Sequence, residues 1–234
     1  MENYNQFSYQ PDVVYANNVA KAMRGVFMRM FLALLVTAAT SFAVLLNGTF
    51  LAFMLQNSWA YWGLLIAEIV LVFSVSGAIN KLSATTANLL FFLYAIINGV
   101  VLSTIFLVYS ISSIAQTFLI TAGVFGAMAI YGYTTKSDLS KFGSILMMAL
   151  IGLLVCIVVN IFLASSRLDW IISIVGVGIF IGLTAWDTQK IKHMVAYADT
   201  PEALSKVSTL GALSLYLDFI NLFLYLLRFF GGRD

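Results

Sequence analysis

The sequence predicts an all-α integral membrane protein with seven transmembrane helices. Hydrophobic residues make up 62% of the 234 residues and charged residues only 9%, whereas soluble domains are about half apolar and about a quarter charged. The mean hydropathy is +0.98. The apolar residues fall into seven long runs, and lysine and arginine gather in alternate connections between these runs. A water-soluble globule could not bury this much apolar surface, so we expect the lipid bilayer to be the chain's main partner.

Each of the seven runs approaches the roughly 20 apolar residues that a helix needs to cross a bilayer. In chain order they lie at 28–46, 59–79, 86–108, 114–133, 145–163, 170–187 and 210–230. The connections are short, which favours antiparallel neighbours in one bundle. We therefore expect one transmembrane domain at residues 23–232, preceded by a polar cytoplasmic segment at residues 1–22.

The connection before the last run contains a helix-start signal. Thr200 suits an N-cap, Pro201 the first helical position and Glu202 the first turn. These residues predict a short cytoplasmic helix between the sixth and seventh spans.

The distribution of basic residues predicts the orientation. Nine of the 12 lysine and arginine residues fall on the side of the N-terminus when the seven runs are taken as spans. Because cytoplasmic connections carry the excess of lysine and arginine, we expect the N-terminus in the cytoplasm and the C-terminus outside.

The composition argues against several classes of function. One cysteine and one histidine leave no disulfide framework and no two-histidine metal motif. A net charge of +2 provides no dense basic surface for nucleic acid. The sequence contains neither a convincing serine–histidine pair nor a glycine-rich nucleotide-binding motif. We therefore expect no enzyme activity and no organic cofactor.

Three acidic residues within the apolar runs are the strongest functional signal: Glu68, Asp187 and Asp218. A charged side chain at the centre of a membrane helix costs about 2.5–3.5 kcal/mol on insertion scales, so it usually faces the bundle interior and marks a pathway or switch. Among the basic residues, only Arg228 lies clearly within a run.

The two aspartates are expected at similar depths. Asp218 is eight residues past Leu210, or ~12 Å along a helix axis. Asp187 would lie ~8–10 Å from the same membrane surface if its helix continues through Lys192. A close pair of carboxylates is then expected, with the hydroxyl of Thr184 bonded to Asp187. The alternative is an interfacial ion pair of Asp187 with Lys190 or Lys192.

Polar and small residues around Asp218 follow a helical stripe. Their spacing of three and four residues places them on one face of the last run. The stripe consists of Gly211, Ser214, Asp218, Asn221, Tyr225 and Arg228. Such a stripe is expected to face a polar lumen or neighbouring helices, and helix packing alone is the alternative for Gly211 and Ser214.

Two neighbouring carboxylates cannot both ionise without repulsion, so the pair would share a proton over part of the pH range. When deprotonated, the pair would offer hard oxygen ligands to Ca²⁺. The hypothesis is therefore that Asp187 and Asp218 form a proton-sensing gate and a Ca²⁺ site. Glu68 and Arg228, ~10 Å apart in depth, form a candidate latch at the outer mouth. The alternative is that Arg228 reaches the interface while Glu68 bonds with Tyr61 or Asn98.

Three segments resemble the Bax inhibitor-1 family, specifically its bacterial branch: "YGYTTKSDLSKFG", "GLTAWDTQKIK" and "LGALSLYLDFINLFLYLLRFFG". The resemblance covers nearly the whole chain and implies a seventh helix surrounded by the other six, in the bacterial inner membrane. It implies a pH-sensitive calcium leak that acid closes, with Ca²⁺ and H⁺ as the ions handled. The family's sensor would fall on Asp187 and Asp218, and its latch on Glu68 and Arg228. The second-helix arginine of some relatives has no equivalent, and Lys81 is the nearest base.

Three other functions remain as alternatives. Intramembrane aspartyl proteases also carry two aspartates on consecutive helices, but their second aspartate follows Gly-x-Gly, whereas Leu215 and Leu217 occupy those positions here. A proton-coupled transporter would be favoured by helices broken at proline or glycine, and both prolines lie outside the runs. The third alternative is a non-conducting modulator of other membrane proteins.

Overall fold

A computed structural model describes the backbone of residues 10–231 and the side chains of residues 17–231. This part of the chain is helical and contains no strand. The elements are α1 (Gln10–Leu46), α2 (Gly48–Gln56), α3 (Ser58–Ala78), α4 (Ala84–Leu102), the 3₁₀ helix η1 (Ser103–Leu107), α5 (Ile111–Thr134), α6 (Ser140–Leu163), α7 (Ser166–Ala196) and α8 (Pro201–Phe230).

The predicted seven spans are confirmed within the described residues. Seven helical segments are long and apolar enough to cross a membrane, with α4 and η1 together forming the third. Helix α1 begins at Gln10 and runs through the expected boundary between residues 1–22 and 23–232. Residues 1–9 and the end of the expected domain at residue 232 lie outside the described residues.

The expected short helix at Thr200 is instead the first part of α8. Thr200 is the N-cap, and its hydroxyl accepts a hydrogen bond from the backbone N–H of Ala203. The helix continues without interruption to Phe230. The prediction was wrong because the polar residues of this segment form the membrane-proximal turns of a long helix, and no break follows them.

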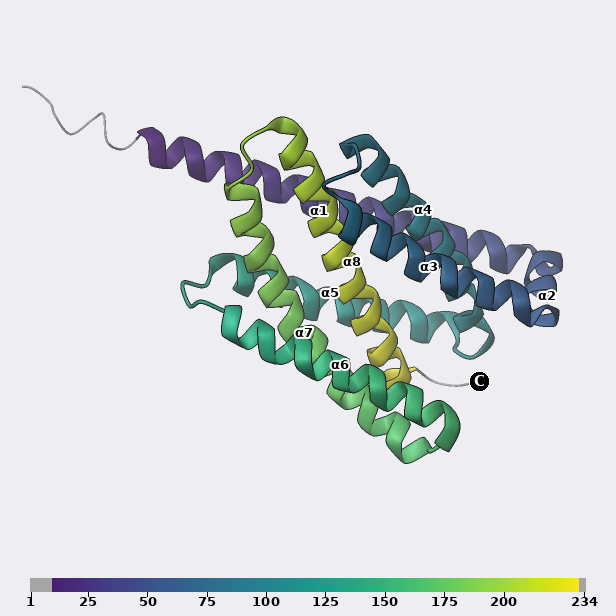
Figure 1. The fold of residues 1–234 in the computed structure, drawn as a ribbon. Coiled ribbons are helices and arrows are strands. Elements are labelled where there is room, and N and C mark those ends of the chain that lie inside the picture. Colours follow the sequence, from purple (N-terminus) through teal and green to yellow (C-terminus); the bar gives the residue numbers. More distant parts are fainter. Residues whose placement is uncertain (1–9, 232–234) are drawn as a thin grey trace, which may run out of the picture.

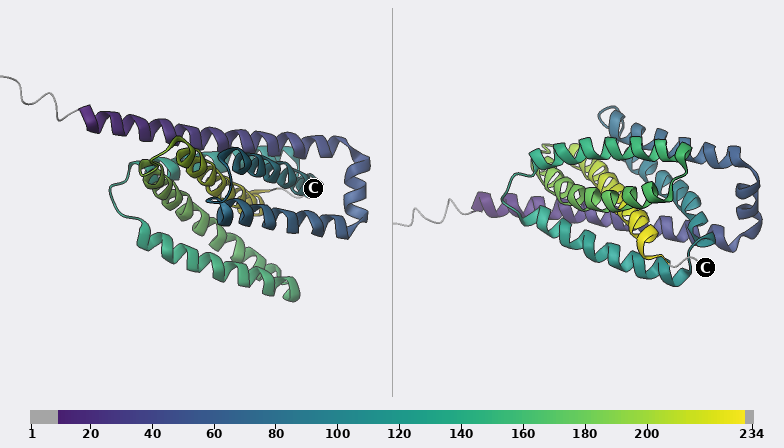
Figure 2. Two further views of the ribbon diagram at one scale, coloured as in Figure 1. Left: turned by 45° about the horizontal axis from the view of Figure 1, so that its top comes forward. Right: turned by 90° about the horizontal axis from the view of Figure 1, so that it is seen from below.

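Helix α2 was not predicted. It is a nine-residue apolar helix, too short to span a membrane, whose N-cap side chain Asn47 accepts from the N–H of Phe50. It lies across the end of the bundle between α1 and α3 (Figures 1 and 2). Its length and position suit the membrane interface.

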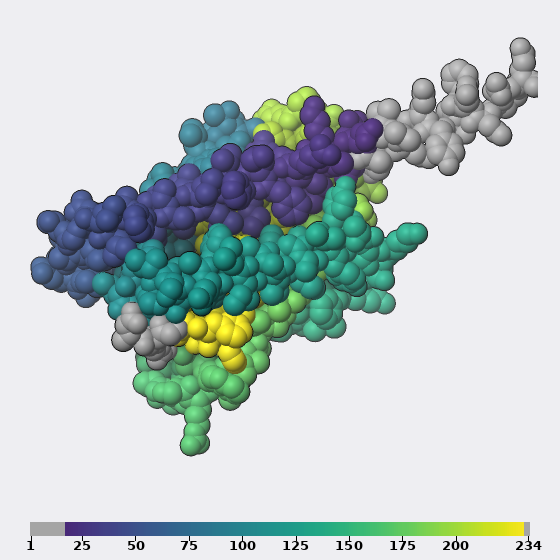
Figure 3. Space-filling model, turned by 180° about the vertical axis from the view of Figure 1, so that it is seen from behind, coloured from purple at the N-terminus to yellow at the C-terminus, as the bar shows by residue number. Residues whose placement is uncertain are grey.

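Helix α8 is the most buried span. In its apolar window 72% of the residues are buried, compared with 11% in α3 and in α6. It runs diagonally through the bundle and packs against α1, α3, α4, α5 and α7 (Figure 1). From behind, α1 and α5 cover most of it (Figure 3). A helix surrounded by all six others stays a prediction, because the main neighbour of α6 is α7.

Glycines allow two close helix crossings. A Cβ on Gly132 of α5 would overlap the backbone carbonyl of Ala185 on α7, and a Cβ on Gly99 of α4 would lie 2.6 Å from the carbonyl oxygen of Thr37 on α1. The two glycines thereby let α5 pack closely on α7 and α4 pack closely on α1.

Candidate functional site between α7 and α8

The polar stripe of α8 faces α7. Gly211 lies against Ile191, where a Cβ would come within 2.8 Å of that side chain. At the other end, Gly176 leaves room for the ring of Tyr225. The predicted stripe is therefore a helix–helix interface along much of its length, consistent with packing through small residues.

Asp218 lies in the middle of this interface. Its side chain is 4% exposed, and within the described chain its Oδ2 atom has no hydrogen-bond partner. An unpartnered buried carboxylate oxygen is costly, so it calls for a proton, a cation or water. Asp218 is thus the buried group most in need of a ligand in this interface.

Asp187 of α7 is partly exposed and lies close enough to Asp218 for the two carboxylates to interact electrostatically. No hydrogen bond joins the two carboxylates among the described residues, so their pairing stays a prediction. Lys190 lies within electrostatic range of both. The predicted depth of Asp187 assumed that its helix continues through Lys192. The helix does so, since α7 ends at Ala196.

The alternative ion pair at Asp187 is not formed among the described residues. The ammonium group of Lys190 lies 4.8 Å from the centroid of the Trp186 ring, a cation–π geometry. Lys192 donates to the carbonyl oxygen of Tyr133 at 2.8 Å. Both lysines have other partners, and Asp187 remains available to Asp218.

The expected bond from Thr184 to Asp187 is absent, and this prediction was wrong. The Thr184 hydroxyl instead donates to the carbonyl of Phe180, one turn earlier on the same helix. Buried threonines commonly satisfy their hydroxyl in this way.

The other stripe residues have structural partners. The Asn221 amide donates to the carbonyl of Leu217 on its own helix. Tyr225 stacks on Phe180 with ring centroids 5.8 Å apart. Ser214 is half-buried. None of the three contacts Asp187 through a bond in the described structure, so their supporting role stays a prediction.

The predicted pair of Glu68 and Arg228 is not formed in this structure. Arg228 donates to Asp169 Oδ1 at 3.0 Å, with both side chains 43% exposed. Glu68 accepts from Asn98 at 2.8 Å, which was the stated alternative. Asp169 lies in the first turn of α7, level with the end of α8.

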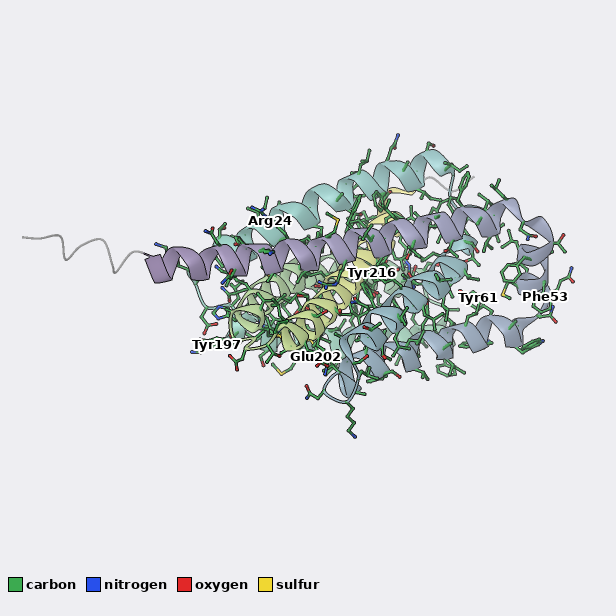
Figure 4. The ribbon with its side chains drawn as sticks, turned by 90° about the horizontal axis from the view of Figure 1, so that it is seen from above. Arg24, Phe53, Tyr61, Tyr197, Glu202 and Tyr216 are labelled. Carbon is green, nitrogen blue, oxygen red and sulfur yellow. The ribbon has the colours of Figure 1, made fainter. Side chains whose placement is uncertain are left out.

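A second polar network lies outside the predicted site. The Tyr216 hydroxyl is 2.6 Å from Thr37 Oγ1 and 3.0 Å from Asn98 Oδ1, and Asn98 in turn donates to Glu68. This chain joins α1, α8, α4 and α3. Figure 4 shows Tyr216 in the middle of the bundle, where α8 passes α1. No sequence pattern indicated this network, because Tyr216 falls outside the polar stripe.

Gln189 was also missed. It is buried, its Nε2 donates to the carbonyl of Ser137, and its Oε1 accepts from the N–H of Leu139. The segment that contains Asp187 therefore also fastens the connection between α5 and α6.

The two aspartates form only part of a Ca²⁺ coordination shell. The described residues hold no cluster of three or more histidine, cysteine or acidic side chains. Since Ca²⁺ takes six to eight oxygen ligands, two carboxylates would need water or carbonyl oxygens to complete a site.

Comparison with known proteins identifies the family. A family model described as inhibitor of apoptosis-promoting Bax1 matches residues 19–234. The chain belongs to the Bax inhibitor-1 family. The resemblance of the three sequence segments is thereby confirmed.

Bacterial relatives cover nearly the whole chain. The inner membrane protein YbhL of Escherichia coli strain K12 is 49% identical over 213 residues, which is 90% of this chain and 91% of the relative. An uncharacterized protein of Borreliella burgdorferi is 46% identical over 214 residues, covering 91% and 92% of the two chains. Together with seven apolar helices, these relatives support a multi-pass inner membrane protein. The names of the family and of the Escherichia coli relative describe a Bax1 inhibitor and an inner membrane protein.

Proposed function

We propose that this Bax inhibitor-1 family protein is a pH-sensitive calcium leak. Asp187 and Asp218 would act as a proton-sensing gate between α7 and α8. The observation that carries the proposal is the buried, unpartnered Oδ2 atom of Asp218, which lies within electrostatic range of the Asp187 carboxylate.

The proposed gate works through charge. At low pH a shared proton would bridge the two carboxylates and hold α7 against α8. When the proton leaves, two negative charges at close range repel each other and attract a divalent cation. Acid would therefore close the leak, and a higher pH would open it.

The experiment is calcium flux into proteoliposomes at several pH values between 5 and 8, with wild type, Asp187→Asn and Asp218→Asn. We expect the flux of wild type to rise with pH and that of both variants to lose this dependence. The matched control is Asp169→Asn, which removes an acid from the first turn of α7. This variant should keep the pH dependence of the wild-type flux. Unchanged pH dependence in both gate variants would refute the proposal.

The same preparations separate the main alternatives. A peptidase assay on a reconstituted membrane substrate should show no cleavage that depends on Asp187 or Asp218. Cleavage lost in both variants would favour an intramembrane protease instead. Absence of any flux in well-folded wild-type protein would favour a non-conducting modulator.

A further inference from the structure

A basic pocket lies at the end of the bundle opposite α2. It has a volume of 540 Å³ and is formed by the early turns of α1, the end of α7 and the start of α8. Figure 4 shows this region, where Tyr197 and Glu202 mark the connection between α7 and α8 beside α1. The pocket is separate from the Asp187–Asp218 interface and from the Glu68 network.

Two cationic side chains of α1 line this pocket: Lys21 and Arg29. They are eight residues apart, or ~12 Å along the helix. Gly25 lies between them in sequence. The guanidinium of Arg29 lies over this glycine, since a Cβ on Gly25 would come within 3.3 Å of Arg29 Nη1. Lys21 and Arg29 therefore place two positive charges in the lining of one pocket.

The guanidinium is poorly satisfied by the protein. Arg29 Nη2 lies 3.5 Å from Ser205 Oγ, at the limit of a hydrogen bond, and neither Lys21 nor Arg29 forms an ion pair within the described residues. A half-buried guanidinium with five donors usually has an oxyanion partner.

The acidic residues close in sequence do not fill this role. Glu202 pairs with Lys206 at 3.0 Å and lines a different pocket. Asp199 is exposed and is not among the residues that line the basic pocket. The positive charge of the pocket is therefore available to an external anion.

The other residues that line the basic pocket indicate which class of anion it suits. Asn18, Ser205 and Ser208 add polar groups near the two cations, whereas Val19 and Leu204 make part of the wall apolar. A phosphate suits the cationic side, because arginine and lysine both bind phosphate oxygens well. Apolar wall residues at the end of membrane spans suit the glycerol and upper acyl carbons of a lipid. Basic pockets between transmembrane helices are known to hold anionic headgroups.

We propose that this pocket binds the phosphate group of an anionic phospholipid. The headgroup would bridge α1 to the start of α8. The lipid would thereby link the bilayer to the helix that carries Asp218.

The test is native mass spectrometry of the purified full chain, titrated with phosphatidylglycerol and, separately, with phosphatidylcholine. We expect wild type to retain phosphatidylglycerol preferentially. The double variant Lys21→Gln/Arg29→Gln should bind it about 10- to 30-fold more weakly, since each basic group near a membrane surface contributes roughly fivefold. The matched control is Lys136→Gln/Lys141→Gln, which removes two exposed charges elsewhere and should retain the wild-type preference.

A second variant pair tests the pocket without changing charge. Gly25→Leu would fill the space beside Arg29 and should also lose the lipid, whereas Gly63→Leu on α3, where a Cβ meets open space, should not. Three results would each overturn the proposal: no preference of wild type for phosphatidylglycerol, equal retention by the basic-pocket variant and its lysine control, or full retention by Gly25→Leu. Binding of inorganic phosphate that does not exclude the lipid would overturn the assignment of this pocket to the headgroup.

Discussion

Removing the hydroxyl of Tyr216 should measurably destabilise the bundle. This side chain is fully buried, and its hydroxyl lies within hydrogen-bond distance of Thr37 on α1 and Asn98 on α4. In Tyr216→Phe, Thr37 keeps its bond to the carbonyl of Ala95, but Asn98 Oδ1 loses the hydroxyl that donates to it.

The magnitude follows from these contacts. A hydrogen bond between membrane helices contributes about 0.6 kcal/mol on average and up to about 1.7 kcal/mol. Leaving a buried acceptor without a partner costs about 1–3 kcal/mol. We therefore expect Tyr216→Phe to lower the free energy of unfolding by about 1–2 kcal/mol.

Reversible unfolding in mixed micelles would measure this loss. The matched control is Tyr131→Phe, because Tyr131 is 48% exposed on α5 and should change stability by less than about 0.5 kcal/mol. In a double-mutant cycle, Thr37→Val and Tyr216→Phe should be coupled, since they remove the two ends of one contact. A loss for Tyr216→Phe no larger than that of the control, with no coupling to Thr37, would refute the proposed network.

Three further predictions concern helix packing and loop attachment. Gly132→Ala should destabilise by about 1–3 kcal/mol, because its Cβ would overlap the backbone of α7, whereas Gly178→Ala, which meets open space, should be neutral or stabilising in the same unfolding assay. Gln189→Leu should speed amide hydrogen exchange in the connection between α5 and α6, and unchanged exchange there would contradict the fastening role. Asp169→Asn should lower the free energy of unfolding by less than about 1 kcal/mol, because the ion pair of Asp169 with Arg228 is half-exposed. A decrease above about 2 kcal/mol would contradict this weak contribution.

The spans could be predicted from sequence because the bilayer imposes a minimum length of apolar residues. The same rule explains the miss at α2, whose nine residues are apolar but too few to span. The N-cap at Thr200 was predicted correctly. The polar turns that follow it suggested a separate short helix, because only the apolar residues were counted as part of the span.

The two candidate aspartates could be singled out because each interrupts an apolar run, where a charged side chain is costly. Their pairing stays a prediction. The partners of Glu68 and Arg228 could not be predicted. Their estimated depths differ by ~10 Å, so other side chains were equally able to reach each of them. The structure resolves the choice by placing Asp169 at the end of Arg228's helix and Asn98 beside Glu68. The network of Tyr216 could not be predicted for a different reason. Its bonds join α8 to α1 and α4, and no spacing within one segment indicates contacts between helices.

The proposed gate requires that Asp187 and Asp218 titrate as a coupled pair. Infrared difference spectroscopy of the protonated carboxyl band, recorded across pH in lipid, measures this most directly. Coupled carboxylates lose their protons in two steps that belong to the pair, so the wild-type titration should differ from the sum of the titrations of Asp187→Asn and Asp218→Asn. A wild-type curve equal to that sum would show two independent acids and contradict the proposed gate.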